Sequence, residues 1–283
     1  MVAPDPRSTR RALLGAAGAV VAANWWWSPV RAQMSAQPAA PEEWAGHERL
    51  DREQVLAALA QARPDAPANF YAKNLSGLKL AGVDFKGANL GAAVLNDADL
   101  TGADLSGCNL TVSFGERALL RGARLRGAVM FSMQLHDADL RDADLTGARF
   151  IGDLRHAHLQ GARLSKMDGA ADMKNQSMGL MRAVMTSADL SGADLSGADF
   201  SRADFSFALL VRANLSRARL FGADFSGASL TEADLSGADA REAKFIDTDF
   251  SRADLSGADF SGSVWRNVRG LGEARREGAR GLP

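Results

Sequence analysis

The sequence predicts an all-β solenoid preceded by one short helix. Three observations lead to this fold class. A large apolar residue recurs every five residues along most of the stretch from Leu75 to Trp265, a small residue stands two positions before it, and a polar residue, commonly Asp or Asn, stands between them. An α-helix has a period of about 3.6 and a flat strand a period of about 2, so neither explains a repeat of five.

Each five-residue unit is expected to form one wall of a coil. The small and the large apolar side chains point to one side and the polar side chain to the other, as in a short extended segment. The next two residues are mostly Ser, Thr, Gly or Arg, which suit a turn. A chain that turns the same way at every corner winds into a coil. Successive coils can then stack about 4.8 Å apart and pair their backbone groups.

The stretch "ADLSGADLSGADF" from Ala188 to Phe200 shows this unit most clearly. In it the chain resembles the pentapeptide-repeat family, whose unit is A-(D/N)-L-x-x, over roughly Leu75 to Trp265. The resemblance implies a right-handed, four-sided parallel β-helix with about 20 residues per coil, which we assign to residues 71–269. Stacking at this interval predicts an outward ladder of Asp194, Asn214, Asp234 and Asp254.

The large residues at the centres of the units are expected to fill the axis of the coil. Burial of each contributes about 1.5–3 kcal/mol before the cost of ordering the chain is subtracted. The core positions on which the prediction rests most firmly are Leu100, Leu105, Leu140, Leu145, Leu190, Leu195, Phe200, Phe205, Phe225, Leu235, Phe250, Leu255 and Phe260.

Residues 1–32 are expected to be a signal peptide. Arg10 and Arg11 form a twin-arginine pair, and the apolar run that follows is shorter than the roughly 20 residues that span a bilayer. Small residues precede an expected cleavage point after Ala32. The segment resembles a bacterial Tat signal, which implies export of the folded chain to the periplasm with no stable membrane insertion after cleavage. The tryptophans at 25–27 leave an uncleaved membrane anchor as the alternative.

A linker and a helix are expected between the signal and the repeats. Residues 33–48 are rich in Pro and Ala and typical of a linker. Residues 49–70 are expected to form a helical cap, because Asp51 and Gln54 have the spacing of a capping box and an apolar stripe follows them. A solenoid end exposes unpaired backbone and apolar side chains, so a covering element is needed.

The repeat is interrupted at two nearby places. One residue is missing between the centres Phe150 and Leu154, and residues 165–184 abandon the pattern as an irregular loop or coil. Methionine is an adaptable contact residue and also a ligand for Cu(I). The segment therefore has three interpretations: a loop that docks a protein partner, a packed irregular coil, or a copper site. The candidate residues are Met167, Met173, Met178 and Met181.

No enzyme is predicted, because no nucleophile–base pair, metal-ligand spacing or cofactor motif is present, and we expect no cofactor. The leading interpretation is an exported scaffold that binds an unidentified protein partner. Some members of the resembled family are gyrase-binding mimics of DNA, but the net charge of −1 and the arginines among the acidic positions disfavour this alternative and any binding of nucleic acid. The resemblance to the family also suggests a homodimer in which two solenoids pair end to end. The charged residues 270–283 are expected to be a tail outside the solenoid.

Overall fold

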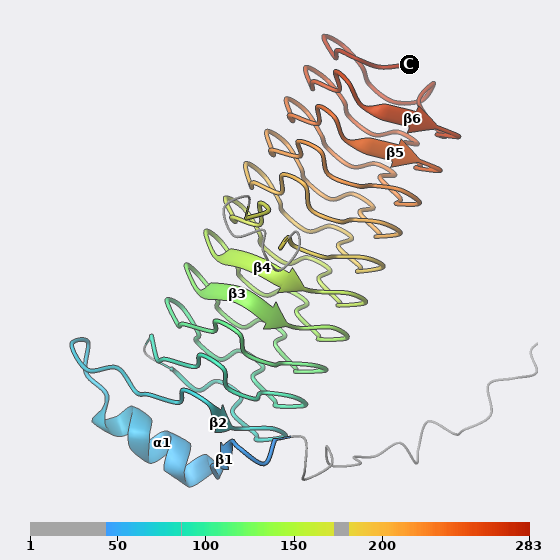
Figure 1. The fold of residues 1–283 in the computed structure, drawn as a ribbon. Coiled ribbons are helices and arrows are strands. Elements are labelled where there is room, and N and C mark those ends of the chain that lie inside the picture. The colour runs from blue at the N-terminus through green and yellow to red at the C-terminus, as the bar shows by residue number, and fades with distance from the viewer. Residues whose placement is uncertain (1–43, 86, 173–180) are drawn as a thin grey trace, which may run out of the picture. The chain divides into compact units, whose positions relative to one another are not determined.

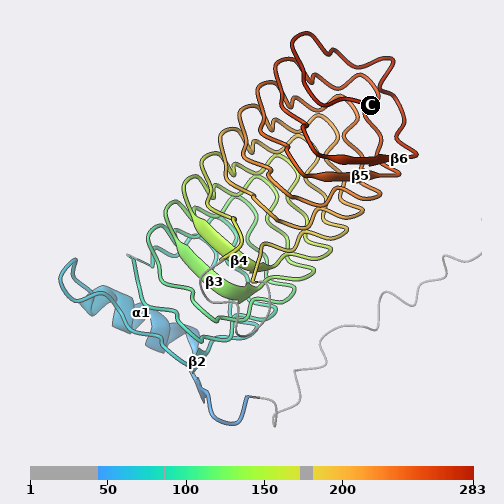
Figure 2. The same ribbon diagram turned by 45° about the horizontal axis from the view of Figure 1, so that its top comes forward.

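Backbone pairing in the computed structural model, which describes residues 44–85, 87–172 and 181–283, repeats every 20 residues over most of its length. Asp194 is bridged in parallel to Asn214, Asn214 to Asp234, and Asp234 to Asp254, so the predicted ladder is confirmed. Four five-residue units therefore make one coil. The coils stack as a row of similar loops and form a β-solenoid (Figure 1, Figure 2).

A rung is the short extended segment by which one coil pairs with the next. Few rungs are long enough to count as strands. These strands pair in parallel as β1 with β2, β3 with β4, and β5 with β6, each pair on adjacent coils (Figure 1). Their bounds are β1 Glu48–Arg49, β2 Lys73–Asn74, β3 Val129–Gln134, β4 Arg149–Asp153, β5 Lys244–Ile246 and β6 Val264–Arg266. Most backbone hydrogen bonds run between adjacent coils, and most of the others close the corners, as Ala98 N donates to Leu95 O at 3.0 Å.

The corners explain the polar consensus of the repeat. The side chain of the outward residue accepts a hydrogen bond from the backbone two residues later, as Asp194 Oδ1 does from Ser196 N at 3.0 Å. The last residue of a unit usually has a positive φ, +67° at Gly192 and +64° at Arg202. This backbone conformation costs an L-residue roughly 1–2 kcal/mol and a glycine almost nothing. The Ser-Gly pair at many corners follows from these two requirements.

The large apolar centres converge on the interior. All the core positions named from the sequence, from Leu100 to Phe260, are 1 % exposed or less. In the C-terminal half one column is aromatic: Phe225 is stacked on Phe205 at 4.9 Å and on Phe245 at 5.5 Å between ring centroids. Trp265 extends this stack at 4.7 Å from Phe245. Stacked rings add to the stability that area burial alone gives.

The helix α1 (Arg52–Gln61) lies at the N-terminal end of the solenoid (Figure 1). Its capping box is present as predicted, since Asp51 accepts from Gln54 N and the Gln54 side chain accepts from Asp51 N. Val55 and Leu59 are buried in the same apolar cluster as the first coils. In the part of the chain that the structure describes, no helix has the length and apolar character needed to cross a membrane.

The predicted linker, residues 33–48, is wrong at its C-terminal end. Residues 33–43 lie outside the described residues, but Glu48 pairs with Lys73 as a rung of the solenoid. Trp44 packs on Phe114 with ring centroids 4.6 Å apart. Phe114 occupies an outward position, which Asp or Asn holds in most units, and this half-buried ring gives Trp44 an apolar surface on which to pack.

The predicted C-terminal boundary is also wrong. Residues 270–283 are not a tail outside the solenoid, because Asp254 is bridged to Arg275 and Asp259 to Arg280. The apolar centres disappear after Trp265, whereas the backbone pairing does not depend on them. The partly buried Leu271 and Leu282 pack against the end of the core.

Candidate functional site

The regular surface of the solenoid is broken at one corner. This corner connects two ladders, each of which is a column of outward residues that pair from coil to coil. The Asn69 ladder contains Asn69, Asn89, Asn109, Val129, Arg149, Asp168, Asp199, Arg219, Asp239, Asp259 and Arg280. The Asn74 ladder contains Asn74, Val94, Phe114, Gln134, Asp153, Val184, Asp204, Asp224, Lys244 and Val264. We call the connection between these two ladders the interrupted corner.

Two opposite irregularities meet at the interrupted corner. In the coil that contains β3, the residue of this corner with a positive φ is Ser132, at +57°. One coil later the positive-φ residue is missing, so that Met133 pairs with Gly152 and the ladder spacing falls from 20 to 19 residues, as between Asp139 and His158. In the following coil the spacing rises to 31 residues, as between His158 and Asp189, which is 11 more than in a regular coil. A deletion and an insertion are therefore neighbours.

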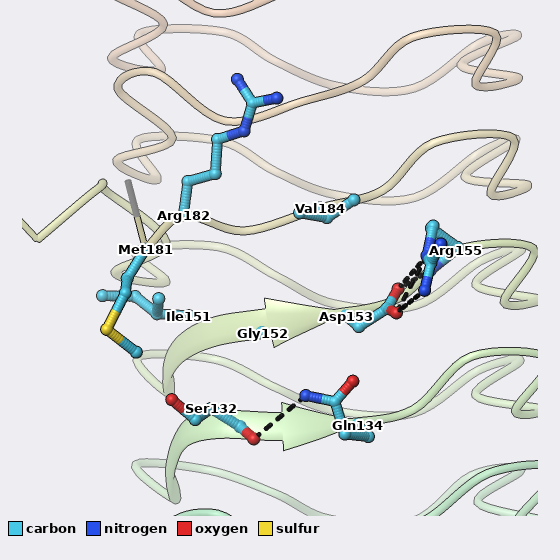
Figure 3. A pocket seen from close by; sticks show the side chains of 9 residues that line it. All are labelled: Ser132, Gln134, Ile151, Gly152, Asp153, Arg155, Met181, Arg182 and Val184. Carbon is cyan, nitrogen blue, oxygen red and sulfur yellow. Dashed lines mark hydrogen bonds and ion pairs between the residues drawn. The ribbon is translucent and has the colours of Figure 1, made fainter. Parts of the chain in front are cut away.

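These irregularities leave a hollow of about 380 Å³ in the surface. Its base is made by β3 and β4, and the chain from Met181 to Val184 borders it (Figure 3). Gly152 is required here, because a Cβ atom at this position would lie 2.2 Å from the carbonyl oxygen of Met133. The residues that line the hollow are Ser132, Gln134, Ile151, Gly152, Asp153, Arg155, Met181, Arg182 and Val184.

The hollow combines an apolar patch with ion pairs at its edge. Met181 lies next to Ile151, and Arg155 lies over Asp153, bonded at 2.9 Å between Nε and Oδ2 (Figure 3). Burial opposes ionisation of Asp153, but the hydrogen bonds from Arg155 outweigh it, and the pKa of the Asp153 carboxyl lies below its usual range. Arg182 Nη2 donates to Asp204 Oδ2 at 2.8 Å. The arrangement can hold a mixed apolar and polar group, and it presents no acid–base pair for catalysis.

The structure corrects the predicted irregular segment, residues 165–184. Residues 165–168 continue the repeat, and Met167 is 1 % exposed in the core, so it cannot contribute to an exposed loop or to a copper site. Its side chain occupies the small-residue position of a unit. The irregular sequence that follows Met167 made this position hard to recognise from the sequence alone. Met181 borders the hollow. Met173 and Met178 lie outside the described residues.

Sequence reasoning did not single out Ser132, Gly152, Asp153 or Arg155. The signal that could have found them was the residue missing between Phe150 and Leu154, because a shortened corner next to a lengthened one must disturb the wall.

Basic residues interrupt the acidic residues of the outer ladders, and among the described residues no more than two acidic residues follow one another on a ladder. Arg219 lies 3.3 Å from Asp199, one coil away on the Asn69 ladder, which continues to Asp239 and Asp259. Lys244 lies 3.4 Å from Asp224 in the same way. Each cation neutralises a carboxylate that a mimic of DNA would need to display, and this pattern disfavours that class of function.

The remaining reactive side chains have structural surroundings. Cys108 is buried, and burial raises the pKa of its thiol to about 12. His136 Nε2 lies 3.5 Å from Glu116, in an ion pair that forms when the histidine is protonated. Among the described residues, no group of three or more His, Cys, Asp or Glu is placed to hold a metal ion.

The chain is similar to several proteins of known structure. HetL from the cyanobacterium Nostoc sp. strain PCC 7120, involved in heterocyst differentiation regulation, is 28% identical and has a TM-score of 0.31 over 78% of this chain and 94% of its own. Rfr23 from the cyanobacterium Cyanothece 51142 is 22% identical, with a TM-score of 0.38 over 44% and 90%. QnrB1, a plasmid-mediated fluoroquinolone resistance protein, is 17% identical, with a TM-score of 0.33 over 77% and 86%.

No curated protein matches the chain. A family model described as pentapeptide repeats (8 copies) matches residues 74–111, 116–152, 180–202, 198–237 and 223–262, which together are more than half of the chain. These matched segments lie within the stacked coils. The chain therefore belongs to the pentapeptide repeat family.

Proposed function

We propose that the chain is an exported, non-catalytic scaffold that binds a protein partner at the hollow of the interrupted corner. Proteins of this family are generally non-enzymatic scaffolds. The observation that carries the proposal is the position of the hollow, at the one corner of the described coils where a deletion and an insertion are adjacent. Regular walls offer flat surfaces, whereas a concave site with apolar and charged groups can anchor a side chain of a partner.

A deletion that restores the regular coil tests this function. Removal of residues 171–181 takes out the 11 extra residues and leaves Arg182 at the corner position that has positive φ in regular coils. A photoreactive amino acid that replaces Ser132 should cross-link a partner in the full-length protein. The same label should fail to cross-link a partner in the deletion variant. The same label at Ser229, on a regular wall, is the matched control. Equal cross-linking from both labelled sites, or in the deletion variant, would reject the proposal.

For export, we propose the Tat route, with cleavage after Ala32 and a periplasmic location. The support is the twin-arginine pair Arg10 and Arg11 and the apolar run after it. Residues 1–43 lie outside the described residues. N-terminal sequencing of protein recovered from the periplasm should begin at Gln33. Recovery in the membrane fraction with Met1 retained would instead support the uncleaved anchor.

Three features of the assembly complete the proposal. The coil is four-sided, supported by four units per 20-residue coil, and right-handed, as the resemblance to the pentapeptide repeat family implies. The helix α1 caps its N-terminal end, supported by the burial of Val55 and Leu59. The chain also pairs end to end through its C-terminal coil, where Trp265 and Leu271 are only partly buried. Light scattering should show a dimer that Leu271→Glu converts to a monomer, and a monomeric native protein would contradict this pairing.

A further inference from the structure

The first four coils carry a surface strip without acidic or basic side chains. The strip comprises residues 69–72, 89–92, 109–112 and 129–132, which form the first four rungs of the Asn69 ladder and the corner after each. Every later residue of this ladder is charged, beginning with Arg149 and Asp168. A charged partner gains no ion pair on such a strip and loses hydration there, so the strip suits an uncharged ligand.

The strip contains a ladder of side-chain amides. Asn89 Nδ2 donates to Asn69 Oδ1 at 3.1 Å, and Asn109 Nδ2 donates to Asn89 Oδ1 at 3.2 Å. The same oxygens accept backbone N–H groups, from Tyr71 to Asn69 at 3.0 Å and from Gly91 to Asn89 at 3.1 Å. Each asparagine amide has two N–H donors, and the ladder uses only one from Asn89 and one from Asn109. The remaining donors are fixed in direction and repeat once per coil.

An exposed aromatic ring lies beside the amide ladder. Tyr71 is 58% exposed. Its Cδ2 lies 3.2 Å from the point that a Cβ atom on Gly91 would occupy, and Gly91 is buried. The ring therefore rests on the next coil, where the absence of a side chain gives it room, and it keeps a large open surface. A rigid ring of this kind binds at a low cost in conformational entropy.

We propose that this strip binds an uncharged, β-1,4-linked glycan chain. A sugar in such a chain has a C–H face that packs on an aromatic ring and hydroxyl groups at its rim that accept from amide N–H donors. The coil spacing of about 4.8 Å is close to the length of one sugar in an extended chain of this linkage, so successive sugars lie beside successive rungs of the asparagine ladder. The strip meets the hollow of the interrupted corner at Ser132, but Tyr71 and the asparagine ladder lie on earlier coils than the rest of the hollow.

Affinity electrophoresis of the full chain tests the proposal. Native gels that contain hydroxyethylcellulose, a soluble β-1,4-linked glucan, should retard the protein, and gels that contain dextran, an α-linked glucan, should not. Tyr71→Ala should weaken the retardation at least tenfold. Asn109→Asp should also weaken it, because it places a charge in the strip while its Oδ1 still accepts the Thr111 N–H, as many outward aspartates do in other units.

Phe207→Ala is the matched control. The Phe207 ring is 63% exposed and also lies on a glycine of the next coil, Gly227, but it follows the charged rung of Asp204 and lies far from the strip in the sequence. This variant should be retarded as strongly as the parent protein. Equal mobility of the parent with and without hydroxyethylcellulose, equal retardation in dextran, or unchanged retardation of Tyr71→Ala would each overturn the proposal.

Discussion

Arg117 and Asp97, which are 20 residues apart in the sequence, form a two-pronged ion pair between adjacent coils. Arg117 Nε donates to Asp97 Oδ1 and Nη2 to Oδ2, both at 2.8 Å. A helix brings together charges three or four residues apart, but this fold brings together charges one coil apart. Pairs of this kind favour one alignment of the coils over displaced ones.

The Arg117–Asp97 pair should contribute modestly to stability. Both side chains are about half exposed, 49% and 50%, so water and salt weaken the attraction. A double-mutant cycle with Arg117→Ala and Asp97→Asn should give a coupling of about 0.2–1 kcal/mol that decreases as salt is added. Asparagine is chosen because residue 97 has a φ of +58°, which asparagine tolerates. A coupling that salt leaves unchanged would contradict this account.

The aromatic stack should contribute far more than any surface pair. Phe225→Ala removes a buried ring from between Phe205 and Phe245, and a cost of about 3–5 kcal/mol in the free energy of unfolding is expected. Denaturant unfolding measures it. Phe207→Ala removes an exposed ring and should cost less than about 1 kcal/mol. Similar costs for the two variants would show that Phe225 does not lie on a packed axis.

Corner positions should respond to glycine according to their backbone conformation. Ser187 has a φ of +59°, so Ser187→Gly should stabilise the protein by about 0.5–1 kcal/mol through relief of this conformation. Ser191 lies one position earlier in its own unit and has no positive φ, so Ser191→Gly should destabilise it by roughly 0.5–1 kcal/mol. Thermal unfolding of the two variants provides the comparison, and effects of the same sign would contradict the corner geometry.

Acid should weaken the solenoid through its paired carboxylates. Hydrogen bonds from Arg141 and Arg121 outweigh burial and hold the pKa of Asp139 well below its usual range. A lowered pKa means that the stabilisation is present at neutral pH and is lost as the pH falls below the ordinary carboxyl range. Asp139→Asn should therefore lower the free energy of unfolding at pH 7. The free energy of unfolding of this variant should also decrease less than that of the parent protein as the pH falls into the acid range.

The control for this experiment is Asp65→Asn, since the Asp65 side chain is 84% exposed. Its stability curve between neutral pH and the acid range should follow that of the parent protein. If Asp139→Asn also follows the parent curve, the pairing with Arg141 does not contribute to stability.

The sequence was sufficient for the repeating part of the fold because each unit has the same local task. One apolar centre, one small residue and one polar residue define the wall, and the ladder from Asp194 to Asp254 follows from their period. The helix α1 was predictable as well, since its capping box is a local signal.

The ends and the break were less predictable because non-local contacts determine them. Trp44 packs on Phe114, which is distant in the sequence, and Arg275 pairs with Asp254 although its unit has no apolar centre. The hollow likewise arises from two irregularities in different coils. Methionine composition directed attention to Met167, whereas the local repeat places it in the core.

The most direct test of the account measures distances between spin labels along one ladder. Cysteines replace Asp194 and, in turn, Asn214, Asp234 and Asp254, while buried Cys108 stays unlabelled. Electron paramagnetic resonance should give separations that increase by about 4.8 Å for every 20 residues, to about 14 Å between positions 194 and 254. Separations that do not increase in equal steps, or a label pair at 194 and 254 that lies far beyond this distance, would contradict a coil with four units per turn.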